Sequence, residues 1–526
     1  MTTRVYPAYI GGKDITGDSG KYVHTVTTRA VLEDTFPSLR LKRDLDLGVV
    51  DIESAGDVVA GACAVADEEM VELALESAAR AAPEWARFPL ATRMEIGYRI
   101  AERLAEHRDE LVEILVAEGQ PRSLAEGMVD GIPLTGWSRE TLGWCAAQMR
   151  FDRHDGEREM ILRRVPDGVV CVNPPQNAAV ANALFGITAL LAGNAVVVRA
   201  PRGIPLAVMY TMREIVAPVL EEAGAPPGTL NALCGPPMLD AWLASEHVDD
   251  IVYIGGSKKG LALERDCVAA GKKPILELAG NDCFVVWRDA DLDVAVESLT
   301  QFFTQSGQIC NVPNQVIAHP AIADELLERL TVAVQKIQPG YPEERGVVLT
   351  PVLMVDAFHA CVAQALGQGA TLVHGGRRLE VDGSPSETGF FLEPTILRVD
   401  GLRDSRSLWV VRDETFFPLL PVIVPEAGAT DDDLLERVIA FVNGNAYGLR
   451  DSFWAGDPSV IDRFAEGATG GGQLKINDSH AGFLPFLPTH GGTGLTGGAF
   501  GEANYLMLRA SHLQGVSIVR PATDTE

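Results

Sequence analysis

The fold is decided by a run of six alternating segments: GVVCV (168–172), ANALFGITALLA (181–192), NAVVVRA (194–200), PLAVMYTMREIVAPVLEEA (205–223), TLNALC (229–234) and DIVYIGG (250–256). The short segments are almost entirely apolar, which is typical of strands that are buried on both faces. The longer segments have the length and composition of helices. Strands that alternate with helices predict a parallel sheet with helical crossovers, and therefore an α/β fold.

The same alternation continues towards the carboxyl end and predicts a second α/β unit. Its segments are ILELAG (275–280), CFVVW (283–287), a helix over 291–304, NQVIAH (314–319), LLERLTVAVQKI (326–337) and TLVHGG (371–376). The last part of the chain is rich in glycine over 491–501 and strand-like over 516–520.

On the amino-terminal side we expect two amphipathic helices, over 67–82 and 91–118. Asp67 can cap the first helix, and Pro83 predicts where it ends. Residues 1–60 predict irregular structure with short strand-like pieces. With 526 residues the chain is too long for a single hydrophobic core, so two or three domains are expected.

The composition, with 47% apolar and 22% charged residues, is typical of a soluble globular protein. No run approaches the roughly 20 apolar residues that cross a bilayer. The amino terminus has no apolar stretch long enough for a signal peptide, so a cytoplasmic location is expected. The net charge of −28 repels phosphate backbones and anionic lipids, and we expect neither nucleic acid nor a membrane as a partner.

Eight cysteines are scattered singly, without a C-x-x-C pair, and the histidines form no H-E-x-x-H motif. Neither a metal site nor a disulfide framework is therefore expected. One of the cysteines, Cys310, ends the segment SGQIC (306–310), after a predicted helix and a small polar turn. A thiolate is a strong nucleophile if its pKa is lowered or a base lies nearby. Taken singly, however, a cysteine is more often a small buried apolar residue.

Glu277 lies in ILELAG, at the end of a predicted buried strand. Burial disfavours the charged form of a carboxyl group and raises its pKa, which suits a general base. A structural glutamate in an ion pair is the alternative interpretation.

Asn177 ends the segment PPQN, between a predicted strand and a predicted helix. A side-chain amide at a strand end can donate a hydrogen bond to a developing oxyanion. A turn or helix-cap asparagine is the alternative.

Gly255, Gly256 and Gly260 lie in GGSKKG, directly after the strand DIVYI. Glycines at this place let a helix begin close to a pyrophosphate. The segment is not a Walker A loop, because Leu261 occupies the position of the required lysine, and it is not G-x-G-x-x-G. An ordinary tight turn is an equally good explanation when the segment is considered alone.

Taken in order, these segments resemble the NAD(P)-dependent aldehyde dehydrogenase superfamily, and the resemblance extends from about residue 68 to residue 519. GVVCVNPPQN resembles a strand that ends in P-W-N, AGNAVVVRA resembles A-G-N-x-V-V-x-K-P, and YIGGSKKG resembles F-T-G-S-x-x-x-G. LELAGND resembles L-E-L-G-G-K, SGQIC matches G-Q-x-C, DETFFP resembles E-E-x-F-G-P, and NAYGL matches x-x-Y-G-L. Each match is weak alone, but their common order makes chance agreement negligible.

The resemblance implies the oxidation of an aldehyde to a carboxylic acid. Cys310 would attack the aldehyde to give a thiohemiacetal, while the side chain of Asn177 and the backbone N–H of Cys310 hold the oxyanion. Hydride transfer to the nicotinamide would leave a thioester, which water activated by Glu277 would hydrolyse.

The resemblance also implies a fold of two parallel-sheet α/β domains and a small β flap for oligomerisation. Residues 1–147 and 167–279 would form the cofactor-binding domain, 280–495 the catalytic domain, and 148–166 with 496–526 the flap. The implied assembly is a homodimer or a homotetramer.

Further site residues follow from the resemblance. Glu414 would hold the nicotinamide ribose, and Phe416 would pack on the nicotinamide. The full cofactor-binding set is Arg199, Arg202, Gly255, Gly256, Gly260, Glu414 and Phe416. The substrate set is Phe185, Asn311 and His490. Since His490 and Asn311 add hydrogen-bonding groups and Ala178 is small, an aldehyde with a polar group is expected.

The chain departs from the family pattern at several positions. Arg199 replaces the usual lysine, and Arg202 falls where members that prefer NAD often carry glutamate. A guanidinium suits a phosphate and offers no acceptor to a hydroxyl group, so NADP is favoured, with NAD as the alternative. Arg202 could instead point to solvent. The other departures are Gln176, Ala178, Ala279, Gln305, Phe417 and a rewritten segment over about 23–58.

Two other functions stay open. A CoA-acylating aldehyde dehydrogenase would pass the acyl group to CoA, but that subfamily generally lacks the base that Glu277 provides. A non-catalytic relative would have lost Cys310 or Glu277, and both are present.

Overall fold

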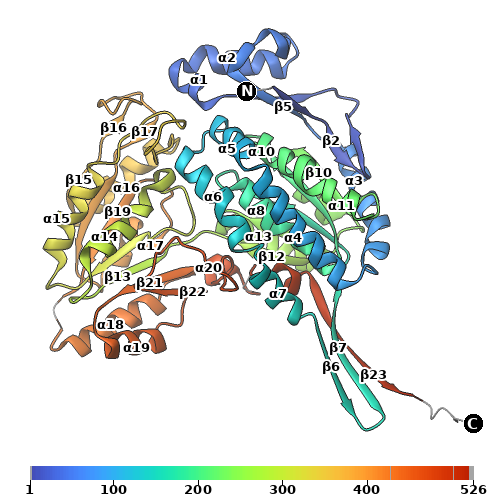
Figure 1. The fold of residues 1–526 in the computed structure, drawn as a ribbon. Helices are drawn as coiled ribbons and strands as arrows, with labels where there is room; N and C mark the ends of the chain where they lie inside the picture. Colours follow the sequence, from blue (N-terminus) through green and yellow to red (C-terminus); the bar gives the residue numbers. More distant parts are fainter. Residues whose placement is uncertain (1–2, 427, 501–502, 521–526) are drawn as a thin grey trace, which may run out of the picture.

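The computed structural model describes residues 3–426, 428–500 and 503–520. It contains two seven-stranded sheets, one in each of two large halves of the molecule (Figure 1). The first sheet has the order β12 (Lys273–Glu277), β11 (Asp250–Ile254), β8 (Val169–Asn173), β9 (Ala195–Pro201), β10 (Leu230–Gly235), β2 (Ala8–Ile10) and β3 (Lys13–Ile15). The first five of these strands are parallel, as expected, and β2 and β3 add an antiparallel edge.

The second sheet confirms the second α/β unit. Its order is β15 (Thr371–His374), β18 (Thr395–Asp400), β19 (Leu419–Val424), β14 (Gln315–Ala318), β13 (Cys283–Val286), β21 (Arg450–Trp454) and β22 (Gln473–Ile476). All neighbours in it are parallel except the edge strand β15.

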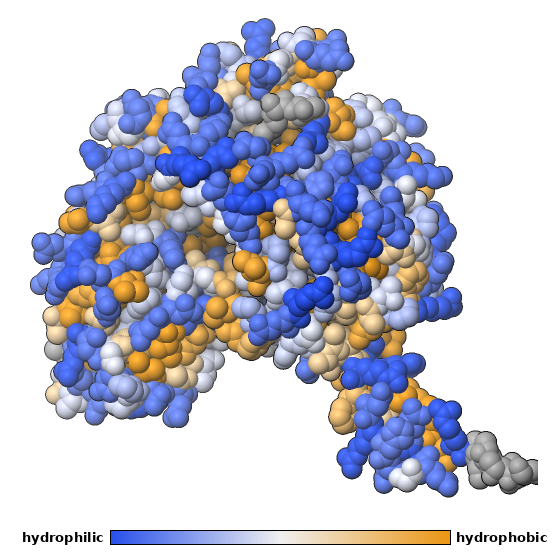
Figure 2. Space-filling view, in the orientation of Figure 1, coloured by the Kyte–Doolittle hydropathy of each residue, from blue (hydrophilic) through white to orange (hydrophobic). Residues whose placement is uncertain are grey.

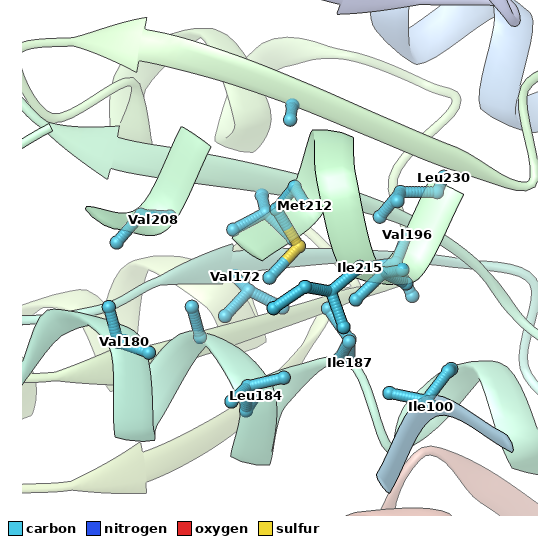
Figure 3. Packing of buried hydrophobic residues seen from close by; sticks show 14 of the residues in the cluster. Ile100, Val172, Val180, Leu184, Ile187, Val196, Val208, Met212, Ile215 and Leu230 are labelled. Carbon is cyan, nitrogen blue, oxygen red and sulfur yellow. The ribbon is translucent and has the colours of Figure 1, made fainter. Parts of the chain in front are cut away.

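Helices cover both faces of each sheet, which explains why the central strands are apolar throughout. On the first sheet, one face is covered by α3 (Glu68–Trp85), α12 (Leu239–Ala244) and α13 (Ser257–Ala269). The other face is covered by α4 (Leu90–Glu106), α5 (Arg108–Ala117), α6 (Arg122–Leu134), α7 (Arg139–Ala147), α8 (Ala179–Gly186), α9 (Ala189–Ala192), α10 (Leu206–Tyr210), α11 (Ala217–Glu222) and α21 (Leu506–Arg509). Figure 3 shows this core between α8, β8, β9 and the segment that follows α10, with Val172, Leu184 and Ile215 close together.

The second sheet is covered in the same way. Its first face packs against α16 (Val355–Gly367), α17 (Trp409–Arg412), α18 (Asp431–Asn443) and α19 (Pro458–Gly467). Its second face packs against α14 (Leu292–Thr300) and α15 (Ala323–Val334). Four further short elements are β16 (Arg378–Leu379), β17 (Phe391–Leu392), β20 (Tyr447–Gly448) and α20 (Gly494–Gly497).

A three-stranded antiparallel sheet projects away from the first half and forms a flap (Figure 1). It contains β6 (Arg150–Asp155), β7 (Arg158–Pro166) and β23 (Ser511–Val519), so the strand expected over 516–520 begins earlier. Its surface is mostly hydrophilic with scattered hydrophobic patches (Figure 2). Of the residues expected in the flap or the glycine-rich stretch, 501, 502 and 521–526 lie outside the described residues, as do residues 1 and 2 of the expected cofactor-binding domain.

The prediction of irregular structure over 1–60 is wrong in part. A small sheet of β1 (Arg4–Tyr6), β5 (Val59–Ala64) and β4 (Tyr22–Val26) is present, but α1 (Thr28–Glu33) and α2 (Thr35–Asp46) lie between β4 and β5. The side chain of Thr27 caps α1. Helix α2 packs little against a core, because it buries only Leu45 while Phe36 and Leu39 are exposed.

The helix boundaries also need correction. Asp67 caps α3 as predicted, but the helix continues past Pro83 to Trp85. The helix expected over 91–118 is two helices, α4 and α5, which are separated at His107. The helix expected over 291–304 ends as α14 at Thr300 and continues as a tighter 3₁₀ segment, because the chain turns there towards Cys310.

Candidate active site

Four predicted site segments follow the carboxyl ends of parallel strands in the first sheet. Asn177 follows β8, Arg202 follows β9, GGSKKG follows β11, and Glu277 ends β12. Carboxyl ends of parallel strands meet at one edge of a sheet. The strand order reverses between β8 and β11, and open α/β sheets bind ligands in the crevice at such a reversal. The space-filling view shows a recess between the two large halves, with hydrophobic side chains on its walls (Figure 2).

Cys310 differs from the other cysteines in exposure. All eight lie within the described residues, and seven are buried whereas Cys310 is only half-buried. The loop before it is strained, because the non-glycine residues Gln305 and Ser306 have φ angles of 52° and 56°. Thr350 holds this loop, since the Ser306 hydroxyl donates to its carbonyl at 2.7 Å and accepts from its N–H at 3.0 Å. A reactive side chain on a loop fixed in this way is pre-positioned.

A close backbone contact fixes Cys310 from the other half of the molecule. Gly280 lies so near that a Cβ on it would be 2.1 Å from the Cys310 carbonyl oxygen. Only glycine fits at this position. The backbone N–H of Gly280 also donates to Glu414 at 3.0 Å. The segment LELAG therefore connects Glu277, Glu414 and the Cys310 loop.

Asn177 is tied to the same loop. Its side-chain amide donates to the carbonyl of Gln308 at 3.0 Å, and one amide hydrogen remains for another acceptor. Its own carbonyl accepts from the side chains of Gln120 at 3.0 Å and Gln305 at 3.2 Å. Gln305, which departs from the family pattern, therefore has a defined role in holding Asn177.

Glu277 is fully buried, and its carboxylate accepts a hydrogen bond from the backbone N–H of Gly491. Burial raises the pKa of Glu277 to about 8, although the Gly491 N–H and the Arg450 guanidinium oppose the rise. A carboxyl group with a pKa near neutrality can both take and release a proton. Burial also raises the pKa of the Glu414 carboxyl to about 8.

The structure brings Phe185 and His490 together. Their rings stack at 4.0 Å between centroids, with 16° between the planes. The side chain of Asn182 donates to the Ala178 carbonyl, so its oxygen faces Nε2 of His490 at 3.0 Å. Burial lowers the pKa of His490 to about 3, so the ring is neutral. Asn311, next to Cys310, is half-buried, and no contact joins it to this pair.

The two arginines expected at the cofactor lie in different surroundings. Arg199 is buried, and its guanidinium donates to the carbonyls of Pro174 at 2.8 Å and Gly235 at 3.2 Å. Burial lowers its pKa to about 10, so it keeps its charge at neutral pH. Arg202 is exposed. It is therefore the arginine with a guanidinium that can reach a ligand.

Helix α13 has the features of an anion-binding helix start. No side chain caps its amino terminus at Gly256, and a Cβ at Gly256 would meet open space. A Cβ at Gly260 would lie 2.1 Å from Leu278, so this glycine allows close packing on the sheet. Free N–H groups with an exposed approach suit a pyrophosphate, so this chain fits a dinucleotide here. Phe416 has a φ of 57°, an uncommon conformation that orients it beside Glu414.

The sequence reasoning missed residues that act through others. Gln120 holds the backbone carbonyl of Asn177, and Asn182 holds the ring of His490. Single polar residues of this kind are common in and around helices, so neither role could be recognised in the sequence. Arg450 and Asp282 are buried charged residues next to Cys310 and Glu277. The runs YGLRDSFW and LAGNDCFVVW carry these charges in otherwise apolar segments, and that signal was available.

None of the helices in the described part of the chain has both the length and the apolar character needed to cross a bilayer. Within the same residues, no three His, Cys, Asp or Glu side chains gather as a metal site would require.

Comparisons with known proteins agree with this geometry. The family model for the aldehyde dehydrogenase family matches residues 49–509. The 3,6-anhydro-alpha-L-galactose dehydrogenase of Vibrio sp. (strain EJY3) is 31% identical over 456 residues, which cover 84% of this chain and 90% of that protein. The vanillin dehydrogenase of Corynebacterium glutamicum is 32% identical over 422 residues, which cover 78% of this chain and 81% of that protein.

The fold agrees as well. The solved structure of 3,6-anhydro-L-galactose dehydrogenase in complex with NAP matches with a TM-score of 0.77 at 25% identity, covering 98% of this chain and 100% of that one. The chain therefore belongs to the aldehyde dehydrogenase family and is an oxidoreductase that oxidises an aldehyde to a carboxylic acid.

Proposed function

We propose that Cys310 is the nucleophile, Asn177 the oxyanion donor and Glu277 the general base of this oxidation. The observation that carries the proposal is the strained loop over 305–310, in which the carbonyl of Gln308, two residues before the half-buried Cys310, accepts from the side chain of Asn177. Gly280 ties the same cysteine to the segment that holds Glu277. Three groups of complementary chemistry are thus fixed relative to one another.

In this mechanism the Cys310 thiolate attacks the aldehyde carbon. The free amide hydrogen of Asn177 and the backbone N–H of Cys310 stabilise the negative charge on the former carbonyl oxygen. The nicotinamide cofactor accepts the hydride when it is bound. Cys310 then carries a thioester, and Glu277 in its carboxylate form takes a proton from the water that hydrolyses it. The presence of Glu277 as a buried carboxyl that can act as a base favours hydrolysis over transfer to CoA.

For the cofactor we propose NADP. Residues 255–260 and the uncapped start of α13 would hold the pyrophosphate. The exposed Arg202 would meet the 2′-phosphate, while Arg199 stays bound to backbone carbonyls and shapes the turn. Glu414 and Phe416 would contact the nicotinamide end. The relative of known structure was solved in complex with NAP, which supports a phosphorylated dinucleotide.

For the substrate we propose an uncharged aldehyde with hydroxyl or other hydrogen-bonding groups. Phe185 gives a flat apolar wall, and the neutral ring of His490 with Asn182 gives polar edges. Asn311 adds an amide beside the nucleophile. The relative that acts on an anhydrosugar fits this class.

For the assembly we propose a homodimer or homotetramer in which the flap contacts a second copy. Phe151, Leu162 and Leu513 are exposed on its strands, although large apolar side chains on an isolated hairpin surface are unfavourable. Light scattering during size-exclusion chromatography measures the state directly, and a monomer at micromolar concentration would contradict this proposal.

The activity is tested by a screen of hydroxylated, aromatic and aliphatic aldehydes with NADP and with NAD, following absorbance of the reduced cofactor. The expected result is a higher kcat/KM for hydroxylated aldehydes with NADP. Best activity with simple aliphatic aldehydes would contradict the proposed substrate class, and CoA-dependent turnover would contradict hydrolysis.

A further inference from the structure

A buried charged cluster lies beside the Cys310 loop, formed by Asp282, Arg450 and His480, which we call the Arg450 cluster. Each of the three side chains is at most 1% exposed. Asp282 comes from the loop between β12 and β13, Arg450 from the start of β21, and His480 from the loop after β22. Buried charges are unfavourable unless they are paired and hydrogen-bonded. The proposed chemistry does not yet use this cluster.

The cluster joins three segments through hydrogen bonds. One oxygen of Asp282 accepts from the backbone N–H of Arg450 at 3.2 Å, and the other lies 3.3 Å from Nε2 of His480. The hydroxyl of Ser452 lies 2.6 Å from Nδ1 of the same ring. The Arg450 guanidinium donates to the carbonyls of His480 and Gly482. Its Nε is buried without a hydrogen-bond partner, so the guanidinium is not fully satisfied by these contacts.

Contacts of the cluster and of its neighbours bring it close to the Cys310 loop. The backbone N–H of Asp282 donates to the side-chain oxygen of Asn314 at 2.9 Å, in the segment that leaves Cys310. Leu449, which precedes the arginine, packs near Gly280, where a Cβ would be 3.2 Å from its side chain. Gly280 is the residue whose backbone contacts the Cys310 carbonyl.

The charges near Cys310 are unbalanced. Burial raises the pKa of the thiol well above its usual range, and the carboxyl groups of Glu277, Glu414 and Asp282 raise it further. The Arg450 guanidinium is the charge that lowers it. Burial would by itself drive proton loss from Arg450, and Asp282 opposes this most strongly.

The other titratable groups around the cluster do not replace Arg450. Burial lowers the pKa of His480 well below its usual range, so that ring is neutral. Asp478 is paired with Lys475 at 2.9 Å. Asp451 accepts from the backbone N–H of Cys283 at 3.1 Å, and burial together with the Asp451 charge raises the pKa of Asp282 well above its usual range.

We propose that Arg450 is a positioning residue whose positive charge, held in place by Asp282, favours the thiolate form of Cys310. The proposal rests on the proposed role of Cys310 as the nucleophile. The arginine stabilises the thiolate, whereas the aspartate acts in two opposing ways, because it fixes the arginine and repels the thiolate; the test therefore rests on the arginine.

The test is the alkylation rate of Cys310 by iodoacetamide between pH 6 and pH 10, in the full-length enzyme without aldehyde. Mass spectrometry of the peptide that contains Cys310 separates it from the seven buried cysteines. Arg450→Met should move the midpoint up by about one pH unit and slow alkylation at pH 7 about tenfold, since one pKa unit is a tenfold change in thiolate. Arg450→Lys should keep the rate within about threefold, because it keeps the charge.

Arg93→Met is the matched control. Arg93 is also a buried arginine that donates to a backbone carbonyl, but it lies in α4, which packs on the first sheet. It should leave the midpoint unchanged. A purely structural role for the cluster predicts no dependence on the charge of residue 450, so equal midpoints in wild type and Arg450→Met would overturn the proposal. If Arg450→Met does not fold, Arg450→Gln, which keeps side-chain N–H donors without the charge, decides in its place: an upward shift supports the proposal, and an unchanged or lower midpoint overturns it. Retained turnover in Cys310→Ala would defeat the proposed function instead, and the alkylation profile does not depend on turnover.

Discussion

The surroundings of Cys310 and the turn that carries Arg202 differ in how firmly they are held. Cys310 lies at the end of a strained loop. Other residues of this loop hydrogen-bond to Asn177 and Thr350, and the Cys310 carbonyl packs against Gly280. Arg202 is exposed after the end of β9, in a turn that the buried Arg199 and a backbone hydrogen bond from Ile204 to Pro201 hold.

This difference reflects the two tasks. Bond formation at carbon requires the reacting groups to be placed to within a fraction of an ångström. An exposed guanidinium can instead reorient to meet a phosphate, and a single substitution there can change the preferred ligand without disturbing the fold. The proposed reacting groups are thus held by many contacts, whereas the proposed cofactor preference depends on few contacts. The predictions below run from the rigid region to the open one.

The largest effect is expected for Cys310→Ala. Loss of the thiol should lower kcat by more than about 10⁴-fold, because covalent catalysis has no substitute nucleophile here. Binding of NADP, followed by fluorescence titration, should change little, since the segments proposed to bind the cofactor follow β9 and β11 and do not include Cys310. A turnover within tenfold of wild type would rule out the cysteine mechanism.

Glu277→Gln should slow hydrolysis of the thioester by about 10²–10⁴-fold, the range typical of a general base. Rapid mixing should then give a burst of reduced cofactor followed by a slow steady state. The wild-type steady-state rate should rise with pH through about 8, because the carboxylate is the active form and the pKa of Glu277 is raised to that value. This rise should be absent in the variant, and unchanged turnover would mean that Glu277 is structural.

Gly280→Ala tests whether the close contact with Cys310 is needed. A Cβ at 2.1 Å from the Cys310 carbonyl oxygen must displace the loop, and a displacement of about 1 Å can lower kcat about 10²-fold. Gly127→Ala in α6, where a Cβ meets nothing within 4 Å, is the control and should leave kcat unchanged. Equal kcat values for the two variants would show that the Cys310 loop is less rigid than its contacts indicate.

Arg202→Glu addresses the open region and should give the smallest change. One charge-assisted contact to phosphate contributes about 1.5–3 kcal/mol, so the NADP to NAD ratio of kcat/KM should fall about tenfold to a hundredfold. Arg40→Glu on α2 makes the same change of charge at an exposed site and should leave the ratio unchanged. An enzyme that prefers NAD before and after the substitution would contradict the proposed role of Arg202.

Much of the fold was predictable because its signals are local. Uninterrupted apolar strands such as β8 and β9 require cover on both faces, and this predicts the parallel sheets. Helix α2 escaped prediction because it contributes little to a core: it buries only Leu45, and Phe36 and Leu39 are exposed. The division of the expected helix at His107 depends on how α4 and α5 pack, which no local pattern shows.

The site was predictable where one residue has one chemical task. Cys310, Glu277 and Asn177 could be named from their segments and order, although their roles stay proposals. Gln120 and Asn182 could not, because they hold residues far away in the sequence: Gln120 holds the backbone carbonyl of Asn177, and Asn182 holds the ring of His490. The Arg450 cluster lies between these cases: its charges interrupt apolar runs, but only the folded chain shows that they lie near the Cys310 loop.

The single peptide unit between His490 and Gly491 has a consequence for engineering this enzyme. The ring of His490 lines the proposed aldehyde pocket, and the next N–H holds the carboxylate of Glu277. A library that varies residue 490 to widen substrate range therefore also varies the lifetime of the acyl-enzyme. Selection on the first turnover would enrich variants that capture aldehydes and release acids slowly. A screen at this position should record sustained product formation over many turnovers, and second-site changes that restore the Gly491 backbone are the natural partners of any new pocket.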